Sequence, residues 1–253
     1  MHRIRRAPFA ALAALVALLP TSAALAQDDA GLPLTADSRI VTRTISEGDS
    51  ASGWTASARI PSIEGPAAID PGWAGFGTAV DSIVAGEIDE FHANLAEWEP
   101  ADGAWKSSFE ADGSVLWVQP PILSMVLDVS VFYAGAAHPG QYAITLVWDA
   151  GRGRALAPED LFRAGSDWPQ ALSREVIPAL ERDLGEMADP AWIAEGAGAV
   201  PESFARWALV EEGLIVFFDP YQVAPYAAGP QAVTIARAAL AEVVDPGGPL
   251  APR

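Results

Sequence analysis

Hydrophobic and polar residues alternate in several short runs of this chain, and such alternation predicts half-buried β-strands. Between residues 71 and 98 the apolar residues instead recur every three or four positions, which predicts a long amphipathic helix. A second long helix is predicted to begin after Asp167, with a kink or break at Pro178. The predicted strands cover residues 54–60, 105–110, 115–118, 123–133, 142–148, 204–210, 214–218 and 232–235. Runs of strands with helices between them favour an α+β fold, a mostly antiparallel sheet packed by two long helices.

Residues 213–240 form the stretch around which the rest of the chain is expected to be organised. Residues 214–218 are apolar at nearly every position, which indicates a strand buried on both faces. Asp219-Pro220 should end this strand, because proline lacks the backbone N–H that a sheet needs. A turn-rich insert follows before the predicted return strand at 232–235.

Two turn signals lie between the predicted strands in the middle of the chain. Asp112-Gly113 is typical of a two-residue hairpin turn, so we expect the strands 105–110 and 115–118 to pair across it. Pro120-Pro121 should separate this hairpin from the strand that follows.

The N-terminal residues have the three parts of an export signal. A basic start precedes an apolar run of 11 residues, and Ala24-Leu25-Ala26 supplies a small-x-small cleavage pattern. We therefore expect residues 1–26 to be a signal peptide cut between Ala26 and Gln27, and the mature chain to be periplasmic or extracellular. The apolar run is too short to span a membrane, so the mature protein should not be membrane-embedded.

The rest of the chain divides by composition into three parts. Residues 27–52 are predicted to be a flexible acidic leader with one short strand at 39–45. Residues 53–244 should form a single α+β domain, or two subdomains at 53–120 and 121–244. The tail 245–253 should be disordered, and the absence of cysteine means that packing alone stabilises the fold.

Charge restricts the classes of partner. The chain has a net charge of −18, and loss of the three arginines in residues 1–26 would make it −21. Such acidity disfavours nucleic acid and anionic membranes as partners and permits a cationic one.

A few residues carry candidate chemistry. His138 lies in a loop rich in Gly and Ala, where it could bind a ligand or tie the loop to backbone groups. Asp219, Tyr221 and Tyr226 could line a ligand groove, or could anchor a turn and pack at the core edge. No second His or Cys completes a metal set around His138, and Ser50 has no oriented base. We therefore expect no metal, no cofactor and no catalytic residue.

Three segments resemble one family of secreted domains: the loop Tyr133–Pro139, Leu161-Phe162 and, above all, residues 217–229. The resemblance runs over residues 54–243. The family includes the extracellular domain of RsiV-type anti-sigma factors, which bind lysozyme, and the non-catalytic domain of PdaC-type peptidoglycan deacetylases. The resemblance implies an envelope-associated α+β domain without settling an activity, and Tyr133 in the matching loop is a further candidate binding residue. Together with the acidic charge, it favours a module that binds a basic protein such as lysozyme, or peptidoglycan. Ala136 departs from the family, which has a second Gly there. A secreted hydrolase, esterase or deacetylase-related enzyme with a divergent site is the alternative.

Overall fold

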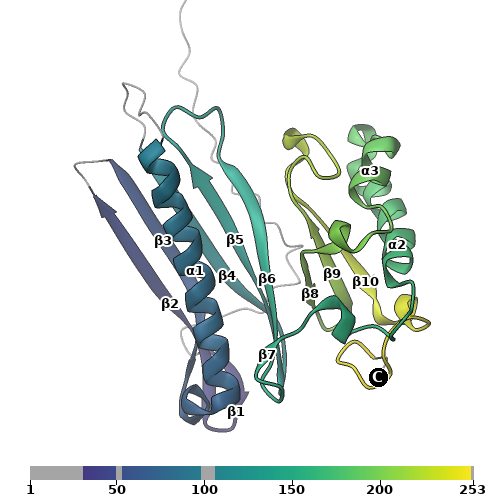
Figure 1. Cartoon of the computed structure of the whole chain (residues 1–253), viewed down its shortest axis with the longest axis horizontal. Helices are drawn as coiled ribbons and strands as arrows, with labels where there is room; N and C mark the ends of the chain where they lie inside the picture. The colour runs from purple at the N-terminus through teal and green to yellow at the C-terminus, as the bar shows by residue number, and fades with distance from the viewer. Residues whose placement is uncertain (1–30, 50–52, 98–105, 252–253) are drawn as a thin grey trace, which may run out of the picture.

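The computed structural model describes residues 31–49, 53–97 and 106–251, and these residues form four layers (Figure 1). Helix α1 (Pro71–Glu97) covers one face of a seven-stranded sheet, and a three-stranded sheet packs on the other face. Helices α2 (Trp168–Leu184) and α3 (Pro190–Gly196) cover the outer face of the smaller sheet. The predicted α+β class is thus confirmed. Within the described ranges, no helix combines the length and apolar character needed to cross a membrane.

The strands of the large sheet lie in the same order as in the chain. They are β1 (Leu32–Thr35), β2 (Ser38–Asp49), β3 (Trp54–Glu64), β4 (Ser107–Gln119), β5 (Ile122–Phe132), β6 (Gly140–Asp149) and β7 (Arg154–Ala155). All neighbours are antiparallel except β3 and β4, which are parallel because α1 crosses over between them.

Strands β1 and β2 lie within the segment that was expected to be a flexible leader, and β2 includes the short strand predicted at 39–45. β2 pairs with β3 along its whole length, and Ile40 is completely buried. Most of the other side chains of β2 are polar and at least partly exposed, which hides the strand pattern in the sequence. The predicted cleavage site and the start of the leader lie outside the described residues.

The predicted hairpin turn at Asp112-Gly113 is also wrong, because β4 runs straight through it. Asp112 pairs with Arg59 of β3 on one side and with Asp128 of β5 on the other. Gly113 is needed for close packing, since a Cβ there would come within 2.7 Å of Pro61. The hairpin turn lies instead at Pro120-Pro121, whose peptide bond is cis.

Helix α1 confirms the prediction from the three-and-four spacing. Its apolar stripe packs on the large sheet. The apolar side chains on one face of β5 belong to the same hydrophobic core. The buried residues of the stripe are Trp73, Phe76, Val80, Val84, Ile88 and Phe91. Gly75 lies against the ring of Trp148, whereas the space around Gly86 is open.

The small sheet has the order β10 (Gln231–Ala236), β9 (Gly213–Phe218), β8 (Trp207–Leu209). Every residue of β9 is buried, as predicted, because one face packs on the large sheet and the other on α2. The N–H of Leu209 donates to Ser124 Oγ at 2.9 Å, and that of Trp207 to Thr145 Oγ1 at 3.2 Å. These hydroxyls of the large sheet satisfy backbone groups that a short edge strand would otherwise leave unpaired.

Helix α2 begins as predicted, with the carboxylate of Asp167 accepting a hydrogen bond from the N–H of Gln170. The helix continues through Pro178 to Leu184, so the predicted break is absent. Its apolar side chains pack against the small sheet, and this packing offsets the backbone hydrogen bond that a proline removes.

The C-terminal tail is ordered over residues 245–251, contrary to the prediction. Leu250 is completely buried, and Arg237 donates a 2.8 Å hydrogen bond to the carbonyl of Pro249. The composition of this segment suggested disorder, but the side chain of Leu250 anchors the segment in the C-terminal core.

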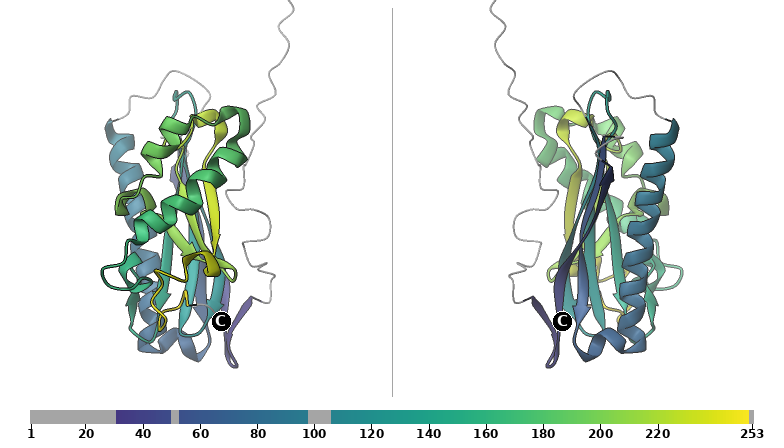
Figure 2. Two further views of the ribbon diagram at one scale, coloured as in Figure 1. Left: turned by 90° about the vertical axis from the view of Figure 1, so that its right-hand side faces the viewer. Right: turned by 90° about the vertical axis from the view of Figure 1, so that its left-hand side faces the viewer.

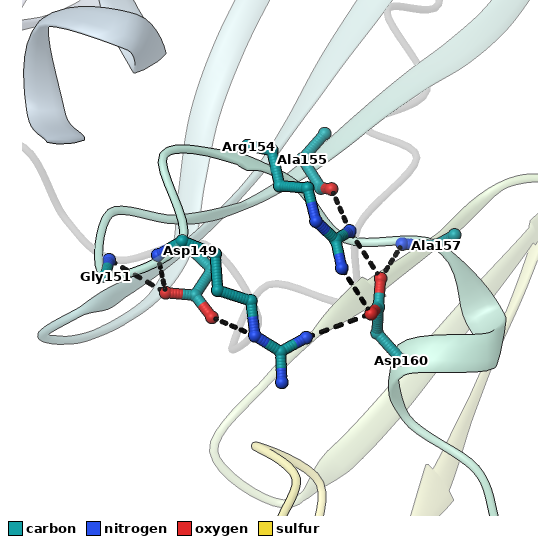
Figure 3. Close-up of polar contacts among 7 residues, drawn as sticks. Asp149, Gly151, Arg154, Ala155, Ala157 and Asp160 are labelled. Carbon is teal, nitrogen blue, oxygen red and sulfur yellow. Dashed lines mark hydrogen bonds and ion pairs between the residues drawn. The ribbon is translucent and has the colours of Figure 1, made fainter.

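A network of ion pairs connects the large sheet to the start of the C-terminal half (Figure 3). Asp160 pairs with Arg154 and Arg152 and accepts the N–H of Ala157. The Arg154 guanidinium is the main reason that the pKa of Asp160 falls to about 2. Asp149, at the end of β6, also pairs with Arg152, so the turn after β6 is held to the segment that leads into α2.

Candidate functional site

Two adjoining cavities are lined in part by the loop between β5 and β6 and by the start of β6. This loop lies at the top of Figure 1. The first cavity, of about 530 Å³, is lined by Arg206, Asp219, Tyr221 and Tyr226, and we call it the Tyr226 cavity. The second, of about 310 Å³, is lined by Phe91, Asn94 and Tyr133, and we call it the Tyr133 cavity. Both share a wall made of Glu87, Glu90, His138, Gly140 and Tyr142. Their volumes are typical of small-ligand sites.

The cavities extend around an open edge of the large sheet. β7 pairs only with Trp148 and Asp149, so the first residues of β6 have no further strand beside them. Arg206 takes the place of that strand by donating a 2.8 Å hydrogen bond to the carbonyl of Ala143. Asp219 accepts the N–H of Ala143 and pairs with Arg206 at 2.8 Å. Burial raises the pKa of Asp219, and Arg206 opposes that rise.

His138 connects the loop after β5 to the insert after β9. Its ring stacks on that of Tyr226 with centroids 3.8 Å apart, and its Nδ1 lies 3.1 Å from the carbonyl of Pro139. The same carbonyl accepts a 2.8 Å hydrogen bond from the hydroxyl of Tyr226. Burial, followed by the neighbouring Tyr221, raises the pKa of Tyr226. His138 therefore connects the loop to backbone groups and also forms part of the cavity wall.

Tyr221 has an unusual backbone conformation, with φ of 72°, which non-glycine residues rarely adopt. Hydrogen bonds hold it there: its N–H donates to the carbonyl of Ala224, and its own carbonyl accepts from Trp192 Nε1 at 3.0 Å. The residue is 55% exposed, and its ring lies 5.8 Å from that of Tyr226. An exposed aromatic ring on a strained but anchored backbone is typical of a binding surface.

The Tyr133 cavity combines tyrosines with carboxylates from α1. The hydroxyl of Tyr142 donates to the carboxylate of Glu87, and burial, that hydrogen bond and the charge of Glu87 all raise the pKa of Tyr142. Tyr133 stacks on Phe91 with centroids 5.7 Å apart. Burial raises the pKa of Tyr133, a hydrogen bond with Asn94 lowers it, and Glu90 raises it. Both phenols therefore lie in a negative environment that favours their neutral form.

The described lining lacks the parts of a catalytic centre that depends on a nucleophile. Among the described residues, neither cavity is lined by Ser, Thr or Cys, so no nucleophile of the serine or cysteine hydrolase type lies beside His138. In the part of the chain that the structure describes, no three His, Asp or Glu side chains lie together as a metal would require. Carboxylates beside aromatic rings are instead suited to hold a cation.

The structure brings His138, Asp219, Tyr221 and Tyr226 together in one cavity and places Tyr133 in the other. Their role in binding stays a prediction. Several lining residues were not predicted from the sequence, among them Glu87, Glu90, Tyr142 and Arg206. The only signal for the two glutamates was their spacing of three on one side of α1, which is equally typical of a solvated face.

Two further residues bear on the candidate chemistry. Ser50 lies outside the described residues. His92 is half-buried: its Nε2 lies 3.1 Å from Glu47, and its ring packs edge-on against Trp54.

Comparison with known proteins relates part of this chain to a described family of domains. Residues 159–238 match DUF3298, described as a protein of unknown function. This DUF3298 region supplies Arg206, Asp219, Tyr221 and Tyr226, whereas α1, β5 and β6 lie before it. The predicted resemblance to PdaC-type proteins is confirmed. The peptidoglycan-N-acetylmuramic acid deacetylase PdaC of Bacillus subtilis is 30% identical over 167 residues, or 66% of this chain and 36% of that protein.

Other relatives extend the comparison. The immunogenic protein MPT64 of Mycobacterium tuberculosis is 28% identical over 122 residues, 48% of this chain and 52% of that protein. The chain thus spans between about a third and a half of these relatives. A DUF3298 family structure from Bacteroides fragilis covers 83% of this chain and 93% of its own, with a TM-score of 0.54 and 17% identity. One from Pseudomonas aeruginosa covers 89% and 99%, with a TM-score of 0.52 and 16% identity. Both similarities show the fold.

Proposed function

We propose that this protein is an exported binding module of the cell envelope that recognises a cationic protein and has no catalytic activity of its own. The observation that carries the proposal is the pair of cavities, in which carboxylates and tyrosines converge and the described lining has no Ser, Thr or Cys beside the histidine. Export is supported by the signal pattern in residues 1–26.

The overall charge supports the same class of partner. A chain with a net charge of −18, or −21 after removal of residues 1–26, attracts positively charged proteins over long range. The resemblance to lysozyme-binding domains makes lysozyme, a basic protein, the first partner to test.

A second candidate is an enzyme or binding protein for glycans, because the relative PdaC is named as a peptidoglycan deacetylase. The matched part amounts to 36% of that protein, so its activity can reside elsewhere in it. The absence of Ser, Thr and Cys from the described cavity lining makes an esterase of the usual serine type the weaker candidate.

Association kinetics at two salt concentrations test the proposal. The screening length falls from about 30 Å at 0.01 M salt to about 8 Å at 0.15 M. If charge steers the encounter, the association rate constant with lysozyme should fall at least tenfold over this range. Stopped-flow fluorescence or surface plasmon resonance would measure it, with an acidic protein of similar size as the control.

A rate constant that does not change with salt would contradict electrostatic steering. No complex with any basic protein at 0.01 M salt, together with turnover of an ester or an acetylated glycan, would overturn the binding function and favour the enzyme.

A further inference from the structure

We propose that the shared wall of the two cavities is a subsite for one basic side chain of a protein partner, whose guanidinium or ammonium group lies between Glu87 and Glu90. This inference rests on the proposed function and specifies how the partner is held. A binding site for a single basic side chain is more specific than the attraction of a whole protein to an acidic surface. The two can therefore be tested separately.

The first argument is that these two carboxylates lack a positive partner. Among the described residues, neither Glu87 nor Glu90 takes part in an ion pair. Two nearby acids do have a basic partner: Asp81, also on α1, pairs with Arg43, and Asp219 pairs with Arg206 in the lining of the Tyr226 cavity. The two glutamates thus leave a negative charge at the cavity wall that no described basic residue neutralises.

The second argument is the set of aromatic rings around these carboxylates. Tyr142 and His138 belong to the shared wall, Tyr133 lines the Tyr133 cavity, and Tyr226, which stacks on His138, lines the Tyr226 cavity. A planar guanidinium gains both from carboxylate oxygens and from the face of an aromatic ring. The carboxylates provide charge and hydrogen-bond acceptors, and the rings provide the flat surface.

The third argument is that part of the subsite is held in place by contacts within the fold, whereas Glu90 is exposed. Glu87 is held by the hydroxyl of Tyr142, and Tyr133 is supported by the buried ring of Phe91. Both glutamates project from the same turns of α1, a helix packed along the large sheet. A site on rigid elements binds with less loss of conformational entropy than a site on loops.

The fourth argument concerns the size and charge of the ligand. The Tyr133 cavity, of about 310 Å³, is at the small end of ligand sites and suits a side chain better than a chain of sugars. A neutral ligand would displace water from Glu90 without offering a positive charge in return, which is unfavourable. A basic side chain fits the small volume of the cavity and also supplies the positive charge.

Nuclear magnetic resonance titrations would test the subsite with small probes. N-acetyl-L-arginine methylamide is the ligand, and the citrulline analogue, which has nearly the same shape but no charge, is its control. We expect the arginine probe to shift the amide signals of residues around Glu87, Glu90 and Tyr142, and the citrulline probe to bind at least tenfold more weakly.

Variants of α1 then assign the binding to the two glutamates. In the double variant Glu87→Gln/Glu90→Gln, the affinity for the arginine probe should fall at least tenfold. The glutamine at position 87 can still accept the hydroxyl of Tyr142, so the fold should persist, as a circular dichroism melt would verify. Asp89→Asn, which removes an exposed charge from the same helix, is the matched control and should change the affinity less than twofold.

Several outcomes would overturn the subsite. Equal binding of the arginine and citrulline probes would do so, as would an equal loss in Asp89→Asn. Binding of D-glucosamine without binding of the arginine probe would assign the cavity to amino sugars instead.

Lysozyme binding separates this inference from the proposed function. If lysozyme binds and the double variant binds it as the wild type does, the subsite is overturned and the proposed function stands. If the arginine probe binds through the two glutamates but lysozyme and other basic proteins do not, the subsite stands and the proposed partner is wrong.

Discussion

Asp219 shows how a single residue can have a role that its sequence context does not reveal. Its position before Pro220 predicted a turn anchor or a ligand contact. In the structure it joins Arg206 in occupying the open edge of β6 at Ala143. The sequence contains both residues, but only the tertiary fold brings the edge of β6 beside them, so local pattern could not have identified this contact.

Asp128 carries a second prediction at the scale of one residue. It lies on β5 opposite Asp112, and its Oδ1 is buried without a hydrogen-bond partner among the described residues. Burial, and secondarily the charge of Asp112, raises the pKa of Asp128 to about 6. Since this pKa is higher than in the unfolded chain, the folded state binds the proton more tightly, and stability from this group is lost as pH rises from about 4 through 6.

Replacement of this carboxyl group should therefore stabilise the protein at neutral pH. We expect Asp128→Asn to raise the free energy of unfolding by about 1–3 kcal/mol at pH 7, with a smaller difference at pH 4.5. Guanidinium unfolding at both pH values would measure it. Glu110→Gln, at an exposed position of β4, is the control and should have little effect. A less stable Asp128→Asn at pH 7 would contradict the prediction.

At the scale of elements, regular patterns were predicted well and pairing partners poorly. The three-and-four spacing identified α1, and the apolar run 214–218 identified the fully buried β9. The Asp112-Gly113 signal failed because Gly113 is required for contact with Pro61 of a strand more than fifty residues earlier. β2 was predicted only over residues 39–45, because a partly exposed strand of a sheet needs few apolar residues.

The residues of the candidate site were likewise predicted only in part. The loop and insert residues around His138 and Tyr226 could be chosen from the sequence because aromatic residues in turns are unusual. Glu87 and Glu90 could not, because nothing local distinguishes a carboxylate facing a cavity from one facing water.

Helix α1 provides a prediction that uses two of its glycines. The space around Gly86 is open, so Gly86→Ala should stabilise the protein by up to about 1 kcal/mol through helix propensity. A Cβ at Gly75 would lie 2.6 Å from the ring of Trp148, so Gly75→Ala should destabilise it. Thermal unfolding of the two variants would show opposite shifts of the midpoint. A shift in the same direction for both would contradict the packing of α1.

At the scale of the whole molecule, the two sheets are held together by a small apolar core. Phe217, which is 1% exposed, faces Leu116, Val126 and Ala143 of the large sheet. Phe217→Ala should lower the free energy of unfolding by about 3–5 kcal/mol, which is a large part of a typical domain's stability.

Urea unfolding of the Phe217→Ala variant would measure this loss. Ile69→Ala is the control, because the side chain of Ile69 is 85% exposed and its removal should change stability by less than about 0.5 kcal/mol. An unchanged midpoint for Phe217→Ala would mean that the two sheets do not depend on this contact.

The division of the cavity walls between two parts of the chain has a consequence for how such proteins diverge. Arg206, Asp219 and Tyr226 lie in the DUF3298 region, but Glu87 and Glu90 come from a helix some seventy residues before it. Substitutions on that helix could change which ligand is accepted while every residue by which the family is recognised stays the same. Two proteins with equally good family matches could then prefer different partners, and a chimaera that exchanges only residues 159–238 would keep the preference of the protein that supplies the helix.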